Sequence, residues 1–345
     1  MNRTPTFLTI FLLAGMILLA NCSFPGLNPP LPTQTPSLVP SPAVTPTDTA
    51  PAPFSPAELG LAENPLILAL PPGANTADQI AAAKTIAAQF TQRTGYTVVT
   101  IVPESYTELV DALEKGNAHI VLLDPYAYEL AYQQGSVNAA YGVMEEGESL
   151  YGSQFLATRK EGFESYYDDI SEENTEEAAI ALAQFTDKKP CWSDESSASG
   201  YVIPLGYLND SQIVTKPAAF VQGHPTVVRS LYATGICDFG ATYVDARDFP
   251  SLEDEFPDLK EQVIVVWQIP EIIPYDIFAF SSSMPQEMQN LFATQVAAIM
   301  QTDEGRAAFK TAYDIEELQV VNDGFYSEFR KYLQASAIDL KTLVK

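Results

Sequence analysis

Short apolar segments and amphipathic segments alternate along this chain, and that order restricts the fold more than any other feature. Residues 66–70 form a buried-strand pattern. The apolar residues after it recur at helical spacing: Ile80, Ala83, Ala87 and Phe90. Asn75 or Thr76 would cap that helix, and Gly95 would follow its end. Strand patterns at 96–102 and 119–123, with helix patterns at 106–115 and from Asp124 onward, continue the series. A βαβαβα order predicts a largely parallel sheet with helices on both faces.

A second series of the same kind begins near Lys189. Its strand patterns are 190–193, 220–221, 236–244 and 263–269, and its helix patterns begin at Ser197 and cover 225–234. Residues 285–345 are mainly helical in pattern, with an amphipathic face made by Met288, Leu291, Phe292, Val296 and Ile299. Two α/β units followed by helices fit two lobes with a ligand between them. Two independent α/β domains without a shared site are the alternative.

The N-terminus has the features of an export signal. Residues 7–20 form an apolar stretch behind a short positive segment, and they are too few to span a membrane comfortably. The stretch ends in Leu-Ala-Asn-Cys at 19–22, which resembles the bacterial lipobox, although Asn21 departs from the usual small residue. We therefore expect a signal peptide at 1–21 and lipidation of Cys22. The alternative is an ordinary secretory signal with an incidental cysteine.

The sequence that follows changes sharply in composition. Residues 24–56 are rich in Pro, Thr, Ser and Ala and almost free of charge, so they cannot build a core. We expect a tether at 22–58 that holds the folded part away from the membrane. No later apolar run reaches membrane-spanning length, so we expect an extracytoplasmic protein attached to the cell membrane by its N-terminal lipid.

The charge of the chain excludes several classes of partner. The sequence has 18 Lys and Arg against 44 Asp and Glu, a formal net charge of -26. Nucleic acids and anionic lipid surfaces both require clustered positive charge, so neither is an expected partner. A small anion remains compatible, because N–H and O–H dipoles inside a cleft can bind it while the outer surface stays acidic.

Two cysteines remain after Cys22, namely Cys191 and Cys237. An oxidising compartment favours disulfides, and both cysteines lie at the start of strand-like segments of the same region. A disulfide between them is geometrically feasible, and two free thiols are the alternative that the sequence leaves open.

Residues 193–201, with the sequence SDESSASGY, connect a strand pattern to a helix pattern. A helix N-terminus has free N–H groups and partial positive charge, which together attract oxyanions. Ser197 and Ser199 would add hydroxyl donors, Ala198 would contribute its N–H group, and Gly200 would permit close backbone approach. We predict an oxyanion site here, with an ordinary N-cap and surface serines as the alternative.

The run from 194 to 204 resembles the D-P-x-S-[TA]-S-G-Y-x-x-P signature of phosphonate, phosphite and phosphate ABC-transporter substrate-binding proteins. Glu195 stands where Pro is usual. The resemblance extends over roughly residues 64–333. Residues 106–128 match another part of the family pattern, although Asp124 stands where Gly is usual. The remaining matches are Tyr151, which precedes the crossover strand at Phe155, the pair Gly223-His224, which Pro225 follows, and residues 273–276.

The resemblance implies an α/β fold of the bilobal type 2 periplasmic-binding-protein class, with two lobes joined by crossover strands. Lobe 1 would comprise 59–155 and 273–345, and lobe 2 would comprise 156–272. The site residues that it implies are Ser197, Ala198 and Ser199 around the oxyanion, Tyr106 and Tyr151 closing from lobe 1, Asp276 and Asp245 at the other end of the ligand, and His224 as a weaker donor. The two carboxylates would receive an ammonium group or a P–OH proton.

The function implied is an extracytoplasmic solute-binding lipoprotein that captures phosphonate, phosphite or phosphate for an ABC permease. We expect a monomer without metal or cofactor. A sensor or binding module without a transporter, and a binder of another small anion such as sulfate or a carboxylate, are the alternatives. We do not expect an enzyme, because the sequence has no P-loop, HExxH, CxxC or GxSxG motif.

Overall fold

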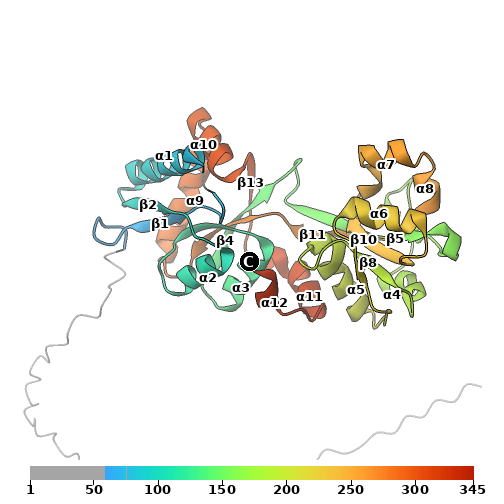
Figure 1. Ribbon diagram of the computed structural model, residues 1–345. Helices are drawn as coiled ribbons and strands as arrows, with labels where there is room; N and C mark the ends of the chain where they lie inside the picture. The colour runs from blue at the N-terminus through green and yellow to red at the C-terminus, as the bar shows by residue number, and fades with distance from the viewer. Residues whose placement is uncertain (1–58, 75) are drawn as a thin grey trace, which may run out of the picture. The chain divides into compact units, whose positions relative to one another are not determined.

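The computed structural model describes residues 59–74 and 76–345. The signal peptide predicted at 1–21, Cys22 and the tether predicted at 22–58 lie outside the described residues. Within the described ranges, no helix is both long enough and apolar enough to cross a membrane. These residues form a six-stranded sheet, a five-stranded sheet and a two-stranded ribbon (Figure 1).

The six-stranded sheet has the strand order β13-β4-β12-β3-β1-β2. Its strands are β1 (Leu66–Ala69), β2 (Val98–Ile101), β3 (Ile120–Leu123), β4 (Val137–Met144), β12 (Ile277–Ser281) and β13 (Glu317–Val320). β1 pairs in parallel with β2 and β3, but β12 and β13 pair antiparallel to their neighbours. The prediction of a largely parallel sheet was therefore wrong for three of its five strand pairs, because β12 returns from the second half of the chain and enters between β3 and β4.

Helices cover both faces of this sheet, as predicted. They are α1 (Ala77–Thr94), α9 (Gln286–Met300) and α10 (Asp303–Tyr313) on one face and α2 (Tyr106–Glu114) and α3 (Pro125–Gln133) on the other. Alternate residues of a strand serve the two faces: Ile120 and Leu122 join the first core, whereas Val121 and Leu123 join the second. Every side chain of β3 is buried, which explains its continuous apolar sequence.

The five-stranded sheet has the order β11-β5-β10-β8-β9. Its strands are β5 (Leu150–Thr158), β8 (Pro190–Trp192), β9 (Ala219–Phe220), β10 (Phe239–Tyr243) and β11 (Val263–Pro274). Figure 1 shows α6 (His224–Ala233), α7 (Pro250–Glu255) and α8 (Leu259–Gln262) on one side of it, with α4 (Ala178–Ala181) and α5 (Ile203–Asp210) on the other. β6 (Tyr167–Asp168) and β7 (Glu173–Asn174) form the ribbon. A disulfide joins Cys191 to Cys237.

Two crossovers connect the sheets. β4 continues into β5, β11 returns into β12, and β5 and β11 pair antiparallel along their length, with Tyr151 opposite Ile273. The last helices, α11 (Ser327–Ala335) and α12 (Leu340–Leu343), return toward both sheets: Tyr332 stacks on Tyr207 of α5 at 3.6 Å between ring centroids, and α12 contacts α3. The α/β fold with two sheets and crossover strands is as predicted, and the division into lobes at 155/156 and 272/273 stays a prediction.

Candidate functional site

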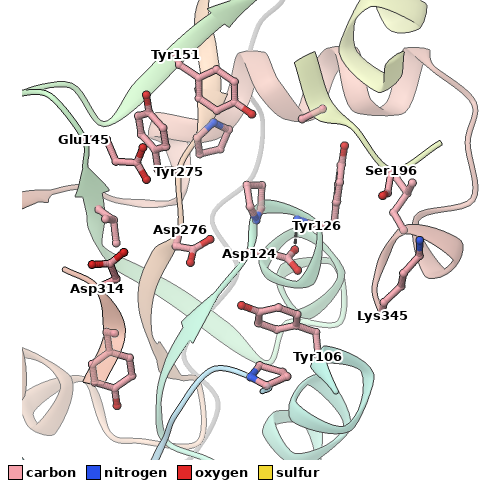
Figure 2. A pocket seen from close by; sticks show the side chains of 17 residues that line it. Tyr106, Asp124, Tyr126, Glu145, Tyr151, Ser196, Tyr275, Asp276, Asp314 and Lys345 are labelled. Carbon is pink, nitrogen blue, oxygen red and sulfur yellow. Dashed lines mark hydrogen bonds between the residues drawn. The ribbon is translucent and has the colours of Figure 1, made fainter. Parts of the chain in front are cut away.

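A cleft of about 720 Å³ opens where the ends of the two sheets meet the crossovers. Figure 2 shows its labelled side chains converging from several elements. The residues that line it are Pro72, Tyr106, Asp124, Pro125, Tyr126, Val143, Glu145, Tyr151, Ser196, Ala198, Pro274, Tyr275, Asp276, Tyr313, Asp314, Leu343 and Lys345. Four of the eight predicted ligand-binding residues are among them: Tyr106, Tyr151, Ala198 and Asp276.

The segment predicted to bind an oxyanion forms the start of a helix at this cleft. β8 ends at Trp192, and a short π-helix (Ala198–Val202) runs directly into α5. Ser197 is the N-cap: its Oγ accepts the N–H of Gly200 at 3.0 Å. In the described part of the chain, the amides of Ala198 and Ser199 have no hydrogen-bond acceptor. The helix start therefore keeps two free donors, while the Ser197 oxygen serves the helix itself.

Gly200 is required by close packing inside this segment. A Cβ at Gly200 would lie 1.8 Å from Oγ of Ser193 and 2.9 Å from Oγ of Ser197. The carbonyl of Ser199 accepts a hydrogen bond from Oγ of Ser153 on β5, at 2.7 Å. Gly200 and Ser153 thus fix how the turn at 197–200 presents its amides.

Tyr106 and Tyr151 bring phenolic hydroxyls to the cleft. Tyr106 is the first residue of α2, and burial, with the charges of Asp276 and Asp124, raises its pKa. Burial raises the pKa of Tyr151 to about 12, although a hydrogen bond with Ser199 opposes the shift. Both hydroxyls therefore keep their protons at neutral pH and are donors for an anion.

Carboxyl groups face these donors. Burial, followed by the charges of Asp124 and Glu145, raises the pKa of Asp276 to about 7. Burial also raises the pKa of Asp124, although its Oδ1 accepts the N–H groups of Tyr126 and Ala127, each at 2.8 Å. Asp124 is the N-cap of α3, so a carboxylate occupies that helix start. The cleft can consequently both accept and donate a proton near neutral pH.

Of the other four predicted residues, three line an adjoining cavity and one lines neither cavity. Ser199, His224 and Asp245 line a second cavity of about 640 Å³. It shares Glu145, Tyr151 and Tyr275 with the first. Nδ1 of His224 accepts the N–H of Tyr243 at 3.3 Å, and burial lowers the pKa of His224 to about 4, so the ring is neutral. Neither cavity lining includes Ser197.

His119, the second histidine of the sequence, has a structural role in the first sheet. Its Nδ1 accepts the N–H of Ile67 at 3.0 Å, and burial lowers its pKa to about 4. It lies beside β3 within the first sheet, away from both cavities. Within the described ranges, no three His, Cys, Asp or Glu side chains are grouped so that they could hold a metal ion.

Several lining residues were missed by the sequence reasoning. Tyr126 follows β3, and ligands of parallel sheets lie beyond the carboxyl ends of strands, so that rule would have indicated it. Lys345 gave no local signal: its carbonyl accepts the N–H of Tyr106 at 2.8 Å, a contact set by tertiary structure. Among the described residues that line the cleft, Lys345 is the one Lys or Arg.

Comparison with known proteins gives consistent matches. A model of the family described as the periplasmic substrate-binding protein of phosphonate ABC transporters matches residues 68–326, which is more than half of the chain. The phosphate-import protein PhnD of Mycolicibacterium smegmatis is 25% identical over 246 residues, covering 67% of this chain and 71% of that protein.

Solved structures match the fold as well. XAC2383 of Xanthomonas citri bound to ATP is 15% identical, with a TM-score of 0.55 over 81% of this chain and 97% of that chain. The same protein bound to chloride ion gives 15% identity and a TM-score of 0.54 over 81% and 98%. At this identity the likeness concerns the fold alone.

Proposed function

The chain belongs to the family of periplasmic substrate-binding proteins of phosphonate ABC transporters, and from that premise we propose that it captures phosphonate, phosphite or phosphate for an ABC importer. Membership confirms the resemblance inferred from residues 194–204. Proteins of this family are extracytoplasmic, bind a small ligand and work with an ABC permease. For this chain, the ligand and the permease partnership are the parts we propose.

The observation that carries the proposal is the pair of free amides at Ala198 and Ser199, at a helix start beside the cleft. Tyr106 and Tyr151 add protonated hydroxyls to the same space. A hydrogen bond to a charged group contributes about 1.5–3 kcal/mol. Four or five such bonds, less the costs of ordering, reach about -8 kcal/mol, which corresponds to micromolar binding.

The carboxyl groups favour a phosphorus oxyanion over sulfate. Asp276 has a pKa of about 7 and Asp124 is buried nearby, so a bound anion meets acceptors as well as donors. Phosphate and its relatives carry a P–OH proton near neutral pH that such a carboxylate can accept, or an ammonium substituent that it can pair with. Sulfate has neither, so its negative charge would lie beside a carboxylate with no proton between the two groups.

Calorimetry tests the proposal directly. The protein is titrated with phosphate, phosphite, methylphosphonate, aminoethylphosphonate and sulfate at neutral pH. We expect micromolar or tighter binding of at least one phosphorus compound, weaker binding of sulfate, and no product release from phosphate or phosphonate esters. Binding of sulfate alone, of none of the five, or steady turnover would contradict the proposal.

We also propose that Cys22 carries the lipid and that the chain acts as a monomer. The first rests on the lipobox-like sequence at residues 19–22, and the second on a cleft that described residues of one chain line by themselves. In cells, Cys22→Ala should move the protein from the membrane fraction to the extracytoplasmic soluble fraction, and gel filtration should give the mass of one chain. Retention of the variant in the membrane would refute the lipid assignment, and a dimer in gel filtration would refute the proposed monomer.

The lobes predicted at 59–155 with 273–345 and at 156–272 would close over the ligand by bending at the two crossovers. α11 contacts residues of both predicted lobes: Arg330 pairs with Glu129, and Tyr332 stacks on Tyr207. We therefore expect a modest closure. Small-angle scattering should show a smaller radius of gyration with ligand than without it, and identical profiles would argue against hinged closure.

A further inference from the structure

The hydroxyl of Tyr126 is buried in the wall of the cleft without a partner. Tyr126 is 7% exposed, and its Oη has no hydrogen-bond partner in the described part of the chain. Figure 2 shows its ring extending from the start of α3 into the space between Tyr151 and Ser196. Leaving a buried hydroxyl unpaired costs free energy, so native proteins seldom do so without a functional or structural reason.

The base of this side chain is held firmly. Asp124 caps α3 and accepts the N–H of Tyr126 at 2.8 Å, and Pro125 occupies the first helical position. The ring packs 6.3 Å from the ring of Phe329, centroid to centroid. With the backbone and the ring fixed, the hydroxyl has little freedom to find another acceptor, and its direction is set by the fold.

Its surroundings keep the hydroxyl protonated. Burial raises the pKa of Tyr126, and Tyr151 and the charges of Asp124 and Asp194 raise it further. Asp194 belongs to the same segment as the free amides of Ala198 and Ser199, so this tyrosine faces the proposed oxyanion end of the cleft. A phenol that never ionises here acts as a hydrogen-bond donor.

We propose that Tyr126 donates a hydrogen bond to an oxygen of the bound oxyanion, from the side opposite the amides of Ala198 and Ser199. This assignment rests on the proposed function and adds one ligand contact to it. The ligand-free protein bears the cost of the unpaired hydroxyl, and ligand binding removes that cost. Tyr126 therefore couples affinity to stability: the group that strengthens binding weakens the empty protein.

A matched pair of variants tests the contact. Tyr126→Phe removes only the hydroxyl. Tyr326→Phe is the control, because the Tyr326 hydroxyl is also buried without a partner in the described part of the chain, but Tyr326 does not line the cleft. Each variant is titrated with phosphate and methylphosphonate by calorimetry, and its thermal unfolding midpoint is measured without ligand.

We expect both variants to unfold at the wild-type temperature or above it, because each loses an unsatisfied buried group. Only Tyr126→Phe should bind more weakly, by about tenfold. Wild-type affinity in Tyr126→Phe, or an equal loss in both variants, would overturn the assignment. A lower unfolding midpoint in Tyr126→Phe would also overturn it, since the hydroxyl would then be paired in the empty protein. If the wild type binds neither ligand nor any other phosphorus compound of the panel, the proposed function itself fails.

Discussion

Oγ of Ser153, on the crossover strand β5, donates its hydrogen bond to the carbonyl of Ser199 at 2.7 Å, with the carbonyl of Thr242 also within reach at 2.9 Å. Ser153 is fully buried. This one hydroxyl joins the strand that links the two sheets to the turn that carries the free amides of Ala198 and Ser199. We therefore expect a movement of β5 to shift the helix start at Ala198 as well.

Ser153→Ala should therefore weaken oxyanion binding severalfold, because the turn loses the bond that orients its amides. It should also lower the free energy of unfolding by about 1–3 kcal/mol, since buried carbonyls lose a donor. Calorimetry and urea unfolding measure the two effects. Ser230→Ala is the control: its Oγ bonds the carbonyl of Thr226 at 2.7 Å inside α6, so affinity should not change. If Ser153→Thr fails to restore affinity, or if both alanine variants bind equally well, the positioning role is wrong.

Asp276 should make the empty protein less stable as the pH rises. Burial and the charges of Asp124 and Glu145 raise its pKa from 3.8 to about 7. Between those values the folded state keeps a proton that the unfolded state has released, so this stabilisation is complete at low pH and is lost as the pH rises through about 7. At 1.36 kcal/mol per pKa unit, the free energy of unfolding falls by at most roughly 4 kcal/mol over this range, and by less with solvent screening.

Asp276→Asn should flatten that part of the pH profile, measured by urea unfolding from pH 4.5 to 8. Asp314 lines the same cleft but its side chain is 85% exposed, so Asp314→Asn should leave the profile as it is. The ligand panel provides a second measurement, because Asp276→Asn should change the order of preference among phosphate, phosphite and aminoethylphosphonate. An unchanged order together with an unchanged profile would remove Asp276 from the site.

Lys345 should contribute long-range attraction for the anion. Its side chain lines the cleft among several carboxylates. Hydrogen bonds from Ser196 lower the pKa of Asp194, and the charge of Lys345 lowers it further. Lys345→Gln should weaken binding of a divalent oxyanion a few fold and reduce the dependence of affinity on ionic strength. Lys341→Gln, at an exposed position of α12, is the matched control. Equal salt dependence in both variants and the wild type would show that Lys345 has no part in binding.

Local elements could be predicted because their causes are local. Helix α1 begins and ends where expected: the side chains of Thr76 and Gln79 form a reciprocal capping box, and Gly95 closes the helix with a positive φ of 78°. The position of β12 between β3 and β4 could not be predicted, since it depends on pairing between segments that are far apart in sequence.

The same distinction applies to the site. The segment 193–201 was identified because a dense run of hydroxyls and a glycine before a helix has a direct physical meaning, and Ala198 does line the cleft. Asp245 and His224 were grouped with it by resemblance, and the structure has them in the adjoining cavity together with Ser199 of the segment. Tyr126 lies just after the end of β3, where the rule for parallel sheets would have indicated it. Lys345 reaches the cleft through the docking of the last helix, which no short motif encodes.

The buried ion pair between Arg330 and Glu129 should be important for stability. Both contacts measure 2.7 Å, and Glu129 is fully buried, which raises its pKa. Arg330→Ala should lower the free energy of unfolding by about 3–5 kcal/mol, because it leaves a buried carboxylate without its partner. Lys310→Ala breaks only exposed pairs with Asp314 and Glu316, so the urea midpoint should hardly move. Similar midpoints for the two variants would mean that Glu129 finds another partner or takes up a proton at no cost.

The disulfide between Cys191 and Cys237 should stabilise the second sheet without altering the site. Cys191 lies on β8 directly before the segment at 193–201, and the bridge closes a loop with a sequence separation of 46. Loop-closure entropy for that length predicts a contribution of about 4 kcal/mol to the free energy of unfolding. Reduction should therefore lower the urea midpoint strongly, and a variant with both cysteines changed to Ala should match the reduced wild type. At urea concentrations below the unfolding transition, the reduced protein should bind the ligand as tightly as the oxidised protein, because β8 is also held by its parallel pairing with β10. Two titratable thiols in the untreated protein, or the same midpoint with and without reductant, would contradict the bridge.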